Sequence, residues 1–309
     1  MLEYLLRRLL WSFIVVWGVV TLVFVMLRVL PGDPADTMIT DWGMSAEDLE
    51  EIREQMGLND PIHVQYGRFI WDALHGDFGR SIWSNRLVSH QIADQLPSTI
   101  KLALASMVLT LLIGIPLGIV AAINHNTWID SLSMLVALGG VSMPTFWLGL
   151  VLIMVFAVRL DWFPMAGTGG MKYLILPAFT LGFRFAGRIA RLTRSSMLEV
   201  LRADYITTAR AKGLAERVVV TVHGLRNALI PVITLLALQL AALLGGAVIT
   251  ETVFSRRGIG AMAVAAVKEK DYPLMQGLAV VVALMYVLAN LGVDLAYGWL
   301  DPRIRDARN

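Results

Sequence analysis

The feature that most constrains the fold of this chain is a set of long stretches without a single Asp, Glu, Lys or Arg. There are five, covering residues 9–27, 102–129, 131–158, 228–250 and 272–293. An α-helix needs about 20 apolar residues to cross the hydrocarbon core of a bilayer, so each stretch predicts a membrane span. The chain is 57% hydrophobic and 16% charged, against about 45–50% and about 25% in soluble domains. This composition excludes an ordinary soluble enzyme.

A sixth span is predicted where an apolar stretch runs into arginines. Residues 173–183 carry no acid, lysine or arginine, and Arg184, Arg188, Arg191 and Arg194 follow at helical spacing. We interpret the whole segment as one helix whose second half carries the arginines. The expected fold class is therefore an all-α integral membrane protein with six transmembrane helices.

Basic residues predict which way the spans run. Arg7 and Arg8 precede the first stretch, which is longer than a signal-peptide core and is followed by no small-x-small cleavage site, so we interpret it as a retained anchor. Residues 184–227 carry nine Lys or Arg against three acids, and loops rich in basic residues stay in the cytoplasm. We expect both termini on that side. The net charge of +2 is too small to indicate nucleic-acid binding.

The stretches also divide the chain into parts. We expect an N-terminal anchor helix over 1–29, an extracytoplasmic helical loop region over 30–100, a five-helix core over 101–300 and a cytoplasmic tail over 301–309. In the outer region, apolar periodicity predicts one helix over 45–56, with Ser45 as its cap and Gly57 as its end. A second helix is predicted over 64–74.

Motifs that carry chemistry are missing from the sequence. It contains no Gly-x-x-x-x-Gly-Lys-Ser/Thr phosphate loop, no His-Glu-x-x-His and no cysteine, and its five histidines are scattered. Gly258-Ile259-Gly260 lies between two predicted spans and is interpreted as a turn. We therefore expect no ATP hydrolysis, no catalytic residue and no metal site in this chain.

The most informative local pattern lies in the loop over residues 195–227. Asp204 can cap a new helix there, and Ala209, Ala211 and Gly213 provide small side chains and a helix stop. A short element of this kind can dock closely into a cleft of another protein. The alternative is a basic loop held against anionic lipid headgroups.

The order of residues in this loop resembles a family: the membrane-spanning permeases of ABC importers fed by a binding protein, in the dipeptide, oligopeptide and nickel branch. The matching segments are 204–213, which reads DYITTARAKG, and 223–231, which reads HGLRNALIP. Further similar segments are 31–34, 57–61 with Gln65-Tyr66, 76–81, 142–147, 251–254 with 258–260, 271–273 and 301–305. The wider family has Glu-Ala where this chain has Thr207-Thr208, and its Leu-Pro follows the glycine sooner than Pro231 does. Both departures fit this branch.

The resemblance implies a type I importer permease fold and a role for the loop over 195–227. In the family this loop forms a coupling helix that sits in a groove of the ATP-hydrolysing subunit. The residues implied in coupling are Asp204, Tyr205, Thr207, Thr208, Ala209, Arg210, Ala211, Lys212 and Gly213. Small Ala and Gly permit close docking, and Arg210 and Lys212 can meet acidic groove residues.

The resemblance also implies partners and a location. We expect a second homologous permease that forms a heterodimer with this chain, two ABC ATPase subunits or one two-domain ATPase, and an extracytoplasmic solute-binding protein, all at the bacterial cytoplasmic (inner) membrane. This chain would bind no cofactor, because ATP and Mg are used by the partner subunits. Peptides are the first solute expected, while nickel or nickel chelates, glutathione and short oligosaccharides stay open.

The resemblance implies that the third and fifth spans, over 131–158 and 228–250, line a translocation path, and the arginine face of the sixth predicted span is a further candidate. The candidate residues are Met143, Pro144, Gln239, Arg184, Arg188 and Arg191. The three arginines share one helix face, where they can attract a peptide carboxylate or, alternatively, snorkel to the headgroups. The competing hypothesis is a self-sufficient carrier or channel. It predicts intramembrane acidic relays or inverted repeats, and neither is evident in this sequence.

Overall fold

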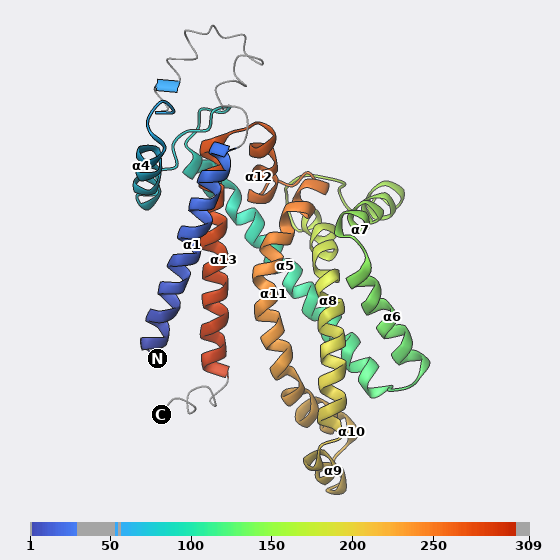
Figure 1. Ribbon diagram of the computed structural model, residues 1–309. Coiled ribbons are helices and arrows are strands. Elements are labelled where there is room, and N and C mark those ends of the chain that lie inside the picture. Colours follow the sequence, from blue (N-terminus) through green and yellow to red (C-terminus); the bar gives the residue numbers. More distant parts are fainter. Residues whose placement is uncertain (1, 30–52, 55–56, 301–309) are drawn as a thin grey trace. The chain divides into compact units, whose positions relative to one another are not determined.

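The computed structural model describes residues 2–29, 53–54 and 57–300, and this part of the chain is almost entirely helical. In chain order the elements are α1 (Leu2–Val29), α4 (Ile62–Leu74), α5 (Val88–Ile123), α6 (Trp128–Ser142), α7 (Thr145–Leu152), the π-helical turn η1 (Ile153–Arg159), α8 (Lys172–Leu201), α9 (Asp204–Ala211), α10 (Glu216–Val218), the π-helical turn η2 (Val219–Gly224), α11 (Leu225–Val253), α12 (Ile259–Lys268) and α13 (Tyr272–Leu300) (Figure 1). Those residues form no β-strand, only an isolated bridge between Arg80 and Leu87. The all-α expectation is confirmed.

Several of these helices are long and apolar enough to cross a membrane. Within the described residues, four single segments qualify: Leu10–Val29, Val88–Ile123, Glu216–Leu240 and Tyr272–Gly292. The bent pair formed by α6 and α7 with η1 makes a fifth if it counts as one span. α8 is 30 residues long, enough to cross, but its arginines make it less apolar, as the sequence predicted.

The third predicted span is broken rather than straight. α6 ends at Ser142 and α7 starts at Thr145, and the two helices are bent by 107°. Met143 and Pro144 both have extended backbones, with ψ of 130° and 132°. A proline disfavours the helical conformation in the residue before it and lacks the N–H that would continue the helix. Pro144, expected as an irregularity inside one span, is therefore a complete helix break.

The chain forms two compact units. One consists of residues 1–97 and 261–291, and the other of residues 98–260 and 292–309. α5, α12 and α13 each begin in one unit and end in the other.

In the second unit, α8 packs against α5 and α6 at backbone distance through glycines. A Cβ on Gly118 of α5 would lie 2.5 Å from the carbonyl oxygen of Ala190 on α8. A Cβ on Gly140 of α6 would lie 2.7 Å from the carbonyl oxygen of Phe183. Gly182 repeats this arrangement between α8 and α5, and its carbonyl oxygen accepts a hydrogen bond of 3.0 Å from the Thr110 hydroxyl. Small residues that bring backbones together are the usual means of helix association in membranes.

α11 packs against another side of α8 through a row of apolar residues. Val232, Leu236, Leu243 and Ala247 are all less than a tenth exposed. They form two clusters with residues of α5 and α8, one around Ile189 and the other around the neighbouring turns of α8. α8 is thus the central helix of this unit.

In the first unit, α4 docks on the last turns of α1. The guanidinium of Arg28 donates two hydrogen bonds, of 3.0 and 2.8 Å, to the side-chain oxygen of Gln65. Tyr66 shares a 2.6 Å hydrogen bond with Thr21, and its ring lies edge-on to Phe24 at 5.2 Å. The helix predicted over 64–74 is confirmed, and Gln65 and Tyr66 are the residues that attach it.

A second link in this unit joins two segments singled out in the sequence, 76–81 and 271–273. The hydroxyl of Ser81 donates a 2.5 Å hydrogen bond to the carboxylate of Asp271, which is fully buried. Asp271 also accepts from the backbone N–H of Leu274 in the first turn of α13. One carboxylate therefore caps α13 and fastens the loop before α5 to it.

Some expectations concern residues outside the described part. The segments 31–34 and 301–309, and most of the helix predicted over 45–56 including Ser45, lie outside it. The predicted end of that helix is described: Gly57 has a φ of +64°, and Gly57 and Leu58 donate to the carbonyls of Glu54 and Arg53. This is the hydrogen-bond pattern of a glycine-terminated helix.

Candidate functional site

The predicted coupling segment is a short helix held on a small apolar base. Ile206 and Ala209 on one face of α9 are 0% and 7% exposed. They pack with Val219 of η2 and with Leu201 at the end of α8. α9 begins one residue earlier than a cap at Asp204 would require, because Ala203 occupies the cap position and Asp204 lies in the first turn. An acid there favours the helix through the helix dipole.

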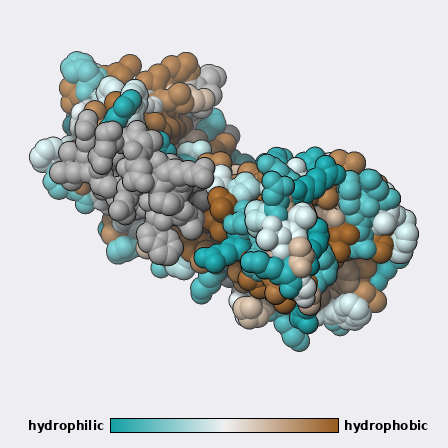
Figure 2. Space-filling model, turned by 90° about the horizontal axis from the view of Figure 1, so that it is seen from below, coloured by the Kyte–Doolittle hydropathy of each residue, from teal (hydrophilic) through white to brown (hydrophobic). Residues whose placement is uncertain are grey.

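The opposite face of α9 is open. Within this chain the exposed residues of the segment are Asp204, Tyr205, Thr207, Thr208, Arg210, Ala211, Lys212 and Gly213. Figure 2 looks onto the end of the molecule that carries α9 and shows much of its surface as hydrophilic. This face projects from the helices that span the membrane.

Of the small residues of the segment, Ala209 lies differently from the expectation and Gly213 lies as expected. Ala209 was expected to face a docking partner, but it is turned into the base beside Val219, so it supports the helix from within. Ala209 follows Ile206 by three residues, so the two side chains lie on the same inner face of α9. Gly213 ends α9 with a φ of +78° and hydrogen bonds from Gly213 and Leu214 to the carbonyls of Arg210 and Ala209. The predicted glycine stop is confirmed.

Side chains stiffen the segment further. Arg210 donates hydrogen bonds of 3.1 and 2.7 Å to the carboxylate of Glu216 across the Gly213 turn. The carboxylate raises the pKa of Arg210 above its usual range. Asn227, in the first turn of α11, donates 2.8 Å to the hydroxyl of Tyr205. Lys212 is left as the cation of the segment that makes no ion pair within the described residues.

α9 is joined firmly to the membrane helices on both sides. Met197 of α8 is fully buried in a cluster with Val220 of η2, Ala228 of α11 and Ala122 of α5. A Cβ on Gly224 would lie 3.3 Å from the Leu201 side chain, so η2 also lies close against α8. Displacement of α9 must therefore displace the adjoining ends of α8 and α11.

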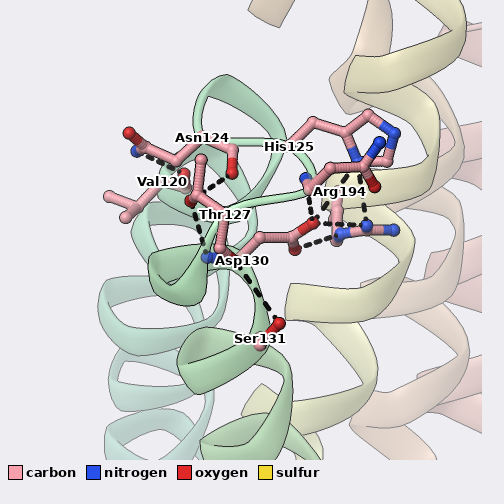
Figure 3. A network of polar contacts seen from close by, with 8 residues as sticks. Val120, Asn124, His125, Thr127, Asp130, Ser131 and Arg194 are labelled. Carbon is pink, nitrogen blue, oxygen red and sulfur yellow. Dashed lines mark hydrogen bonds and ion pairs between the residues drawn. The ribbon is translucent and has the colours of Figure 1, made fainter.

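A polar network that the sequence did not predict lies on the last third of α8, the part that leads into α9. Arg194 donates two hydrogen bonds, of 2.6 and 2.7 Å, to the two carboxylate oxygens of Asp130 (Figure 3). Asp130 sits in the first turn of α6, 5% exposed, and also accepts 3.0 Å from the backbone N–H of Asn126. His125 lies at 3.3 Å from the same carboxylate and 3.2 Å from the guanidinium. We call Arg194, Asp130 and His125 the clamp.

The clamp ties the turn between α5 and α6 to α8. Thr127 caps α6 by accepting from the N–H of Asp130, and Asn126 holds the turn with a φ of +63°. The signals available in the sequence were Thr127, a helix-capping residue followed three positions later by an acid, and a fourth arginine on α8. Nothing in the sequence pairs residues 64 positions apart.

The structure separates the candidates for the path. Arg184, Arg188 and Arg191 are exposed on one face of α8, as their spacing predicted. Met143 and Pro144 are exposed at the break between α6 and α7.

Gln239 does not lie with them. It is 4% exposed, between Leu236 and Leu243 on the face of α11 that packs against α5 and α8. Its amide nitrogen and oxygen have no hydrogen-bond partner in the described part of the chain. In this conformation the helical position of Gln239 points its side chain into the chain's own packing, so its role in a path stays a prediction.

A buried carboxylate explains the glycines after α11. Glu251 is 0% exposed and accepts hydrogen bonds from the Thr99 hydroxyl at 2.6 Å and the Gly260 N–H at 2.9 Å. A Cβ on Gly258 would collide with the Glu251 carboxylate. The segment 258–260 is thus the turn that was expected, and its glycines let the backbone close around Glu251. No pattern in the sequence indicates a role for this acid.

Comparisons with known proteins agree with this architecture. Residues 114–306 match the family described as "Binding-protein-dependent transport system inner membrane component", and residues 1–103 match its N-terminal counterpart. The chain is 42% identical to the dipeptide transport system permease protein DppB of Alkalihalophilus pseudofirmus, over 99% of this chain and 100% of that protein. It is 44% identical to the glutathione transport system permease protein GsiC of Salmonella paratyphi A, over 99% of each.

Solved structures show the same fold at much lower identity. The inward-facing MetNI methionine ABC transporter matches with a TM-score of 0.60 and 18% identity, over 68% of this chain and 96% of that one. An amino acid ABC transporter with histidines matches with a TM-score of 0.52 and 13% identity, over 67% and 92%. Together with the two family matches, which cover nearly the whole chain, these findings show that the chain belongs to the inner membrane components of binding-protein-dependent ABC transport systems.

Proposed function

We propose that this chain is a transmembrane subunit of an ATP-driven importer and forms part of the translocation path for short peptides. Glutathione, itself a small peptide, is the alternative solute within the same class. Both solutes appear in the names of relatives that align along the whole chain. The delivering protein would be a solute-binding protein on the outer side.

One observation carries the ATP-driven part of the proposal, namely the preformed helix α9 on its apolar base. Ile206 and Ala209 on its inner face pack against Val219 of η2, while its outer face is exposed within this chain. A self-sufficient carrier or channel has no need of a rigid projecting helix joined to two spans. A subunit that receives a mechanical input from an ATPase does.

The assembly follows from this assignment. α9 enters a groove of an ABC ATPase, with Tyr205, Thr207, Thr208, Ala211 and Lys212 as contacts. Arg210 contributes once it exchanges Glu216 for a groove acid; since exposed ion pairs are worth about 0–1 kcal/mol, the exchange costs little. Two ATPase subunits, or one with two domains, would bind this chain and a second homologous permease. They use the ATP and Mg, and this chain binds no cofactor.

The same assignment fixes the orientation. The α9 side of the membrane is the cytoplasmic side, and both chain termini lie there. The basic excess over residues 184–227 supports this. Met143 and Pro144, at the break between α6 and α7, line the path together with the arginine face of α8.

The test first identifies the subunits of the complex and then measures its transport activity. The chain is tagged and purified from its native membrane in mild detergent, and its partners are identified by mass spectrometry. The complex is then reconstituted into liposomes with its binding protein, and uptake of labelled dipeptide and of glutathione is measured with and without ATP. A second permease, one or two phosphate-loop ATPases and ATP-dependent uptake are expected. A lone chain that conducts unaided would refute the proposal.

The docking role of α9 has its own variant. Thr208→Trp places a bulky ring on the open face, where it leaves the apolar base intact, and should abolish uptake while the permease stays folded. Thr221→Trp, an exposed position on η2 outside the segment, is the matched control and should transport normally. Equal uptake by both variants would remove α9 from the ATPase contact.

A further inference from the structure

One face of α8 changes character halfway along the helix. On the half nearer Lys172, Thr180 and Leu181 are each 1% exposed, packed within the chain. From Arg184 onward the same face is open, and Arg184, Arg188 and Arg191 all lie exposed on it. The arginines therefore begin where the face opens and continue toward the α9 end.

The depth of Arg184 decides between a lipid-facing and a water-facing position. With a rise of 1.5 Å per residue, Arg184 lies about 18 Å from Lys172, the first residue of α8. If Lys172 marks one boundary of a core about 30 Å thick, Arg184 lies about 12 Å from the other. An extended arginine side chain is shorter than that. With Lys172 at that boundary, Arg188 and Arg191 can reach the headgroups by snorkelling, and Arg184 cannot.

A guanidinium at this depth needs a polar environment, and the chain itself supplies little. Within the described residues no carboxylate forms an ion pair with any of the three arginines. Asp130, the acid of the α5–α6 region, is fully engaged by Arg194 in the clamp. The ring of Phe185 lies 5.9 Å from the Arg188 guanidinium. We call Arg184, Arg188 and Arg191 the stripe. The open face is positively charged and, within the described residues, unneutralised.

We infer that Arg184, Arg188 and Arg191 form a stepped binding track for the carboxylates of the transported solute. Neighbours three and four residues apart on a helix are about 5–6 Å from one another, so a carboxylate can pass between arginines without losing its hydrogen bonds. Several similar sites in series hold an ion without trapping it, as conduction requires. The inference rests on the proposed function and deepens it, because it predicts that solutes are favoured in proportion to their negative charge.

The alternative to solute binding is that acidic side chains of a second permease form permanent ion pairs with the stripe. That arrangement would need up to three buried ion pairs, whose desolvation offsets much of their attraction. It also makes a different prediction, since loss of the arginines would then weaken the assembly rather than alter the preference among solutes.

The experiment compares three dipeptides that differ in net charge: Ala-Glu, Ala-Ala and Ala-Lys. Initial ATP-dependent uptake is measured in liposomes carrying the assembled importer and its binding protein. The wild-type chain is compared with the triple variant Arg184→Gln, Arg188→Gln, Arg191→Gln. For each solute the rate of the variant is divided by that of the wild type, so that the preference of the binding protein cancels. Arg159→Gln, an exposed arginine on η1, is the matched control.

The track predicts a graded loss. Uptake of Ala-Glu by the triple variant should fall about tenfold further than uptake of Ala-Lys, the factor that corresponds to about 1.4 kcal/mol. Ala-Ala should lie between them, Arg184→Lys should retain the wild-type order because it keeps the charge, and Arg159→Gln should match the wild type.

Two results would overturn the inference while leaving the proposed function intact. One is an equal reduction for all three dipeptides, or none. The other is a triple variant that no longer co-purifies with the second permease, which would assign the stripe to subunit contact. A wild-type importer that takes up neither these dipeptides nor glutathione would instead refute the proposed function, and this inference with it.

Discussion

Removing Arg194 should destabilise the permease much more than removing a surface arginine does. In the clamp, the guanidinium of Arg194 donates a bidentate pair of hydrogen bonds to the carboxylate of Asp130, a residue that is 5% exposed. Arg194→Met would leave Asp130 with one backbone N–H, from Asn126, and a neighbouring His125. The variant keeps most of the side-chain volume, so the lost charge pair dominates the effect.

The size of the effect follows from the burial of the two partners. Leaving one member of a buried ion pair unpaired costs about 3–5 kcal/mol. The side chain of Arg194 is 25% exposed against 6% for Asp130, so water replaces part of what is lost. We expect a loss of about 2–3 kcal/mol in the free energy of unfolding, and hence a drop of about 5 °C in Tm, from the scaling known for large domains.

The assay is thermal unfolding of the purified permease in detergent, followed by ATP-dependent uptake in liposomes. Arg86→Met is the matched control, because the Arg86–Asp94 pair has a similar distance of 2.9 Å but side chains that are 61% and 62% exposed. Such a pair contributes about 0–1 kcal/mol, so its loss should be barely measurable. The double variant Arg194→Met, Asp130→Leu should recover much of the stability, since no buried charge is left alone.

The clamp makes a functional prediction as well. Because it is the polar link from the α5–α6 turn to the third of α8 that carries α9, the double variant should be stable but should hydrolyse more ATP per solute imported. If Arg194→Met unfolds at the same temperature as the parent, or if the double variant couples normally, the reasoning about the clamp is refuted.

Three glycine predictions follow from the space around each glycine Cα. Gly118→Leu should prevent stable packing of α5 on α8, because even its Cβ would lie 2.5 Å from the Ala190 oxygen; gel filtration in detergent should show aggregated permease. Gly258→Ala should lower the free energy of unfolding by about 1–3 kcal/mol through overpacking, and so lower Tm, because its Cβ collides with the Glu251 carboxylate. Gly245→Ala, with no atom within 4 Å of the added Cβ, should change the free energy of unfolding by no more than about 0.5 kcal/mol. A large loss there would contradict the steric reasoning behind all three.

The spans were predictable because the membrane imposes a simple rule on sequence. A helix surrounded by lipid must be apolar for about 20 residues. Four of the five charge-free stretches lie within α1, α5, α11 and α13 or extend them by a few residues, and the fifth, 131–158, covers the bent pair of α6 and α7 with η1. The end of α9 was predictable for a similar local reason, since a glycine at a φ of +78° has few substitutes. Local rules of this kind can be applied to a single sequence.

Features that depend on which face of a helix meets which neighbour were not predictable in this way. Ala209 and Gly213 look equivalent as small residues, yet one supports α9 from inside and the other ends it. Gln239 looks like a polar path residue, but its turn of α11 faces α8. The partner of Arg194 is an acid 64 positions away, and only the packing of α6 on α8 brings them together.

The faces of α8 account for how these features work together. Glycines on one side bring α5 and α6 to backbone distance, so α8 cannot slide past them without losing that packing. The clamp fixes the α6 side of the same helix near its α9 end, and the cluster around Met197 fixes η2 and the start of α11 to it. α9 in turn packs through Ile206 on Val219 of η2 and Leu201 of α8. A push on α9 is therefore applied to a rigid group of helices, which favours movement as a body over local bending. The remaining face carries the arginines, so movement of that body also moves the positively charged face, and with it any carboxylate bound there.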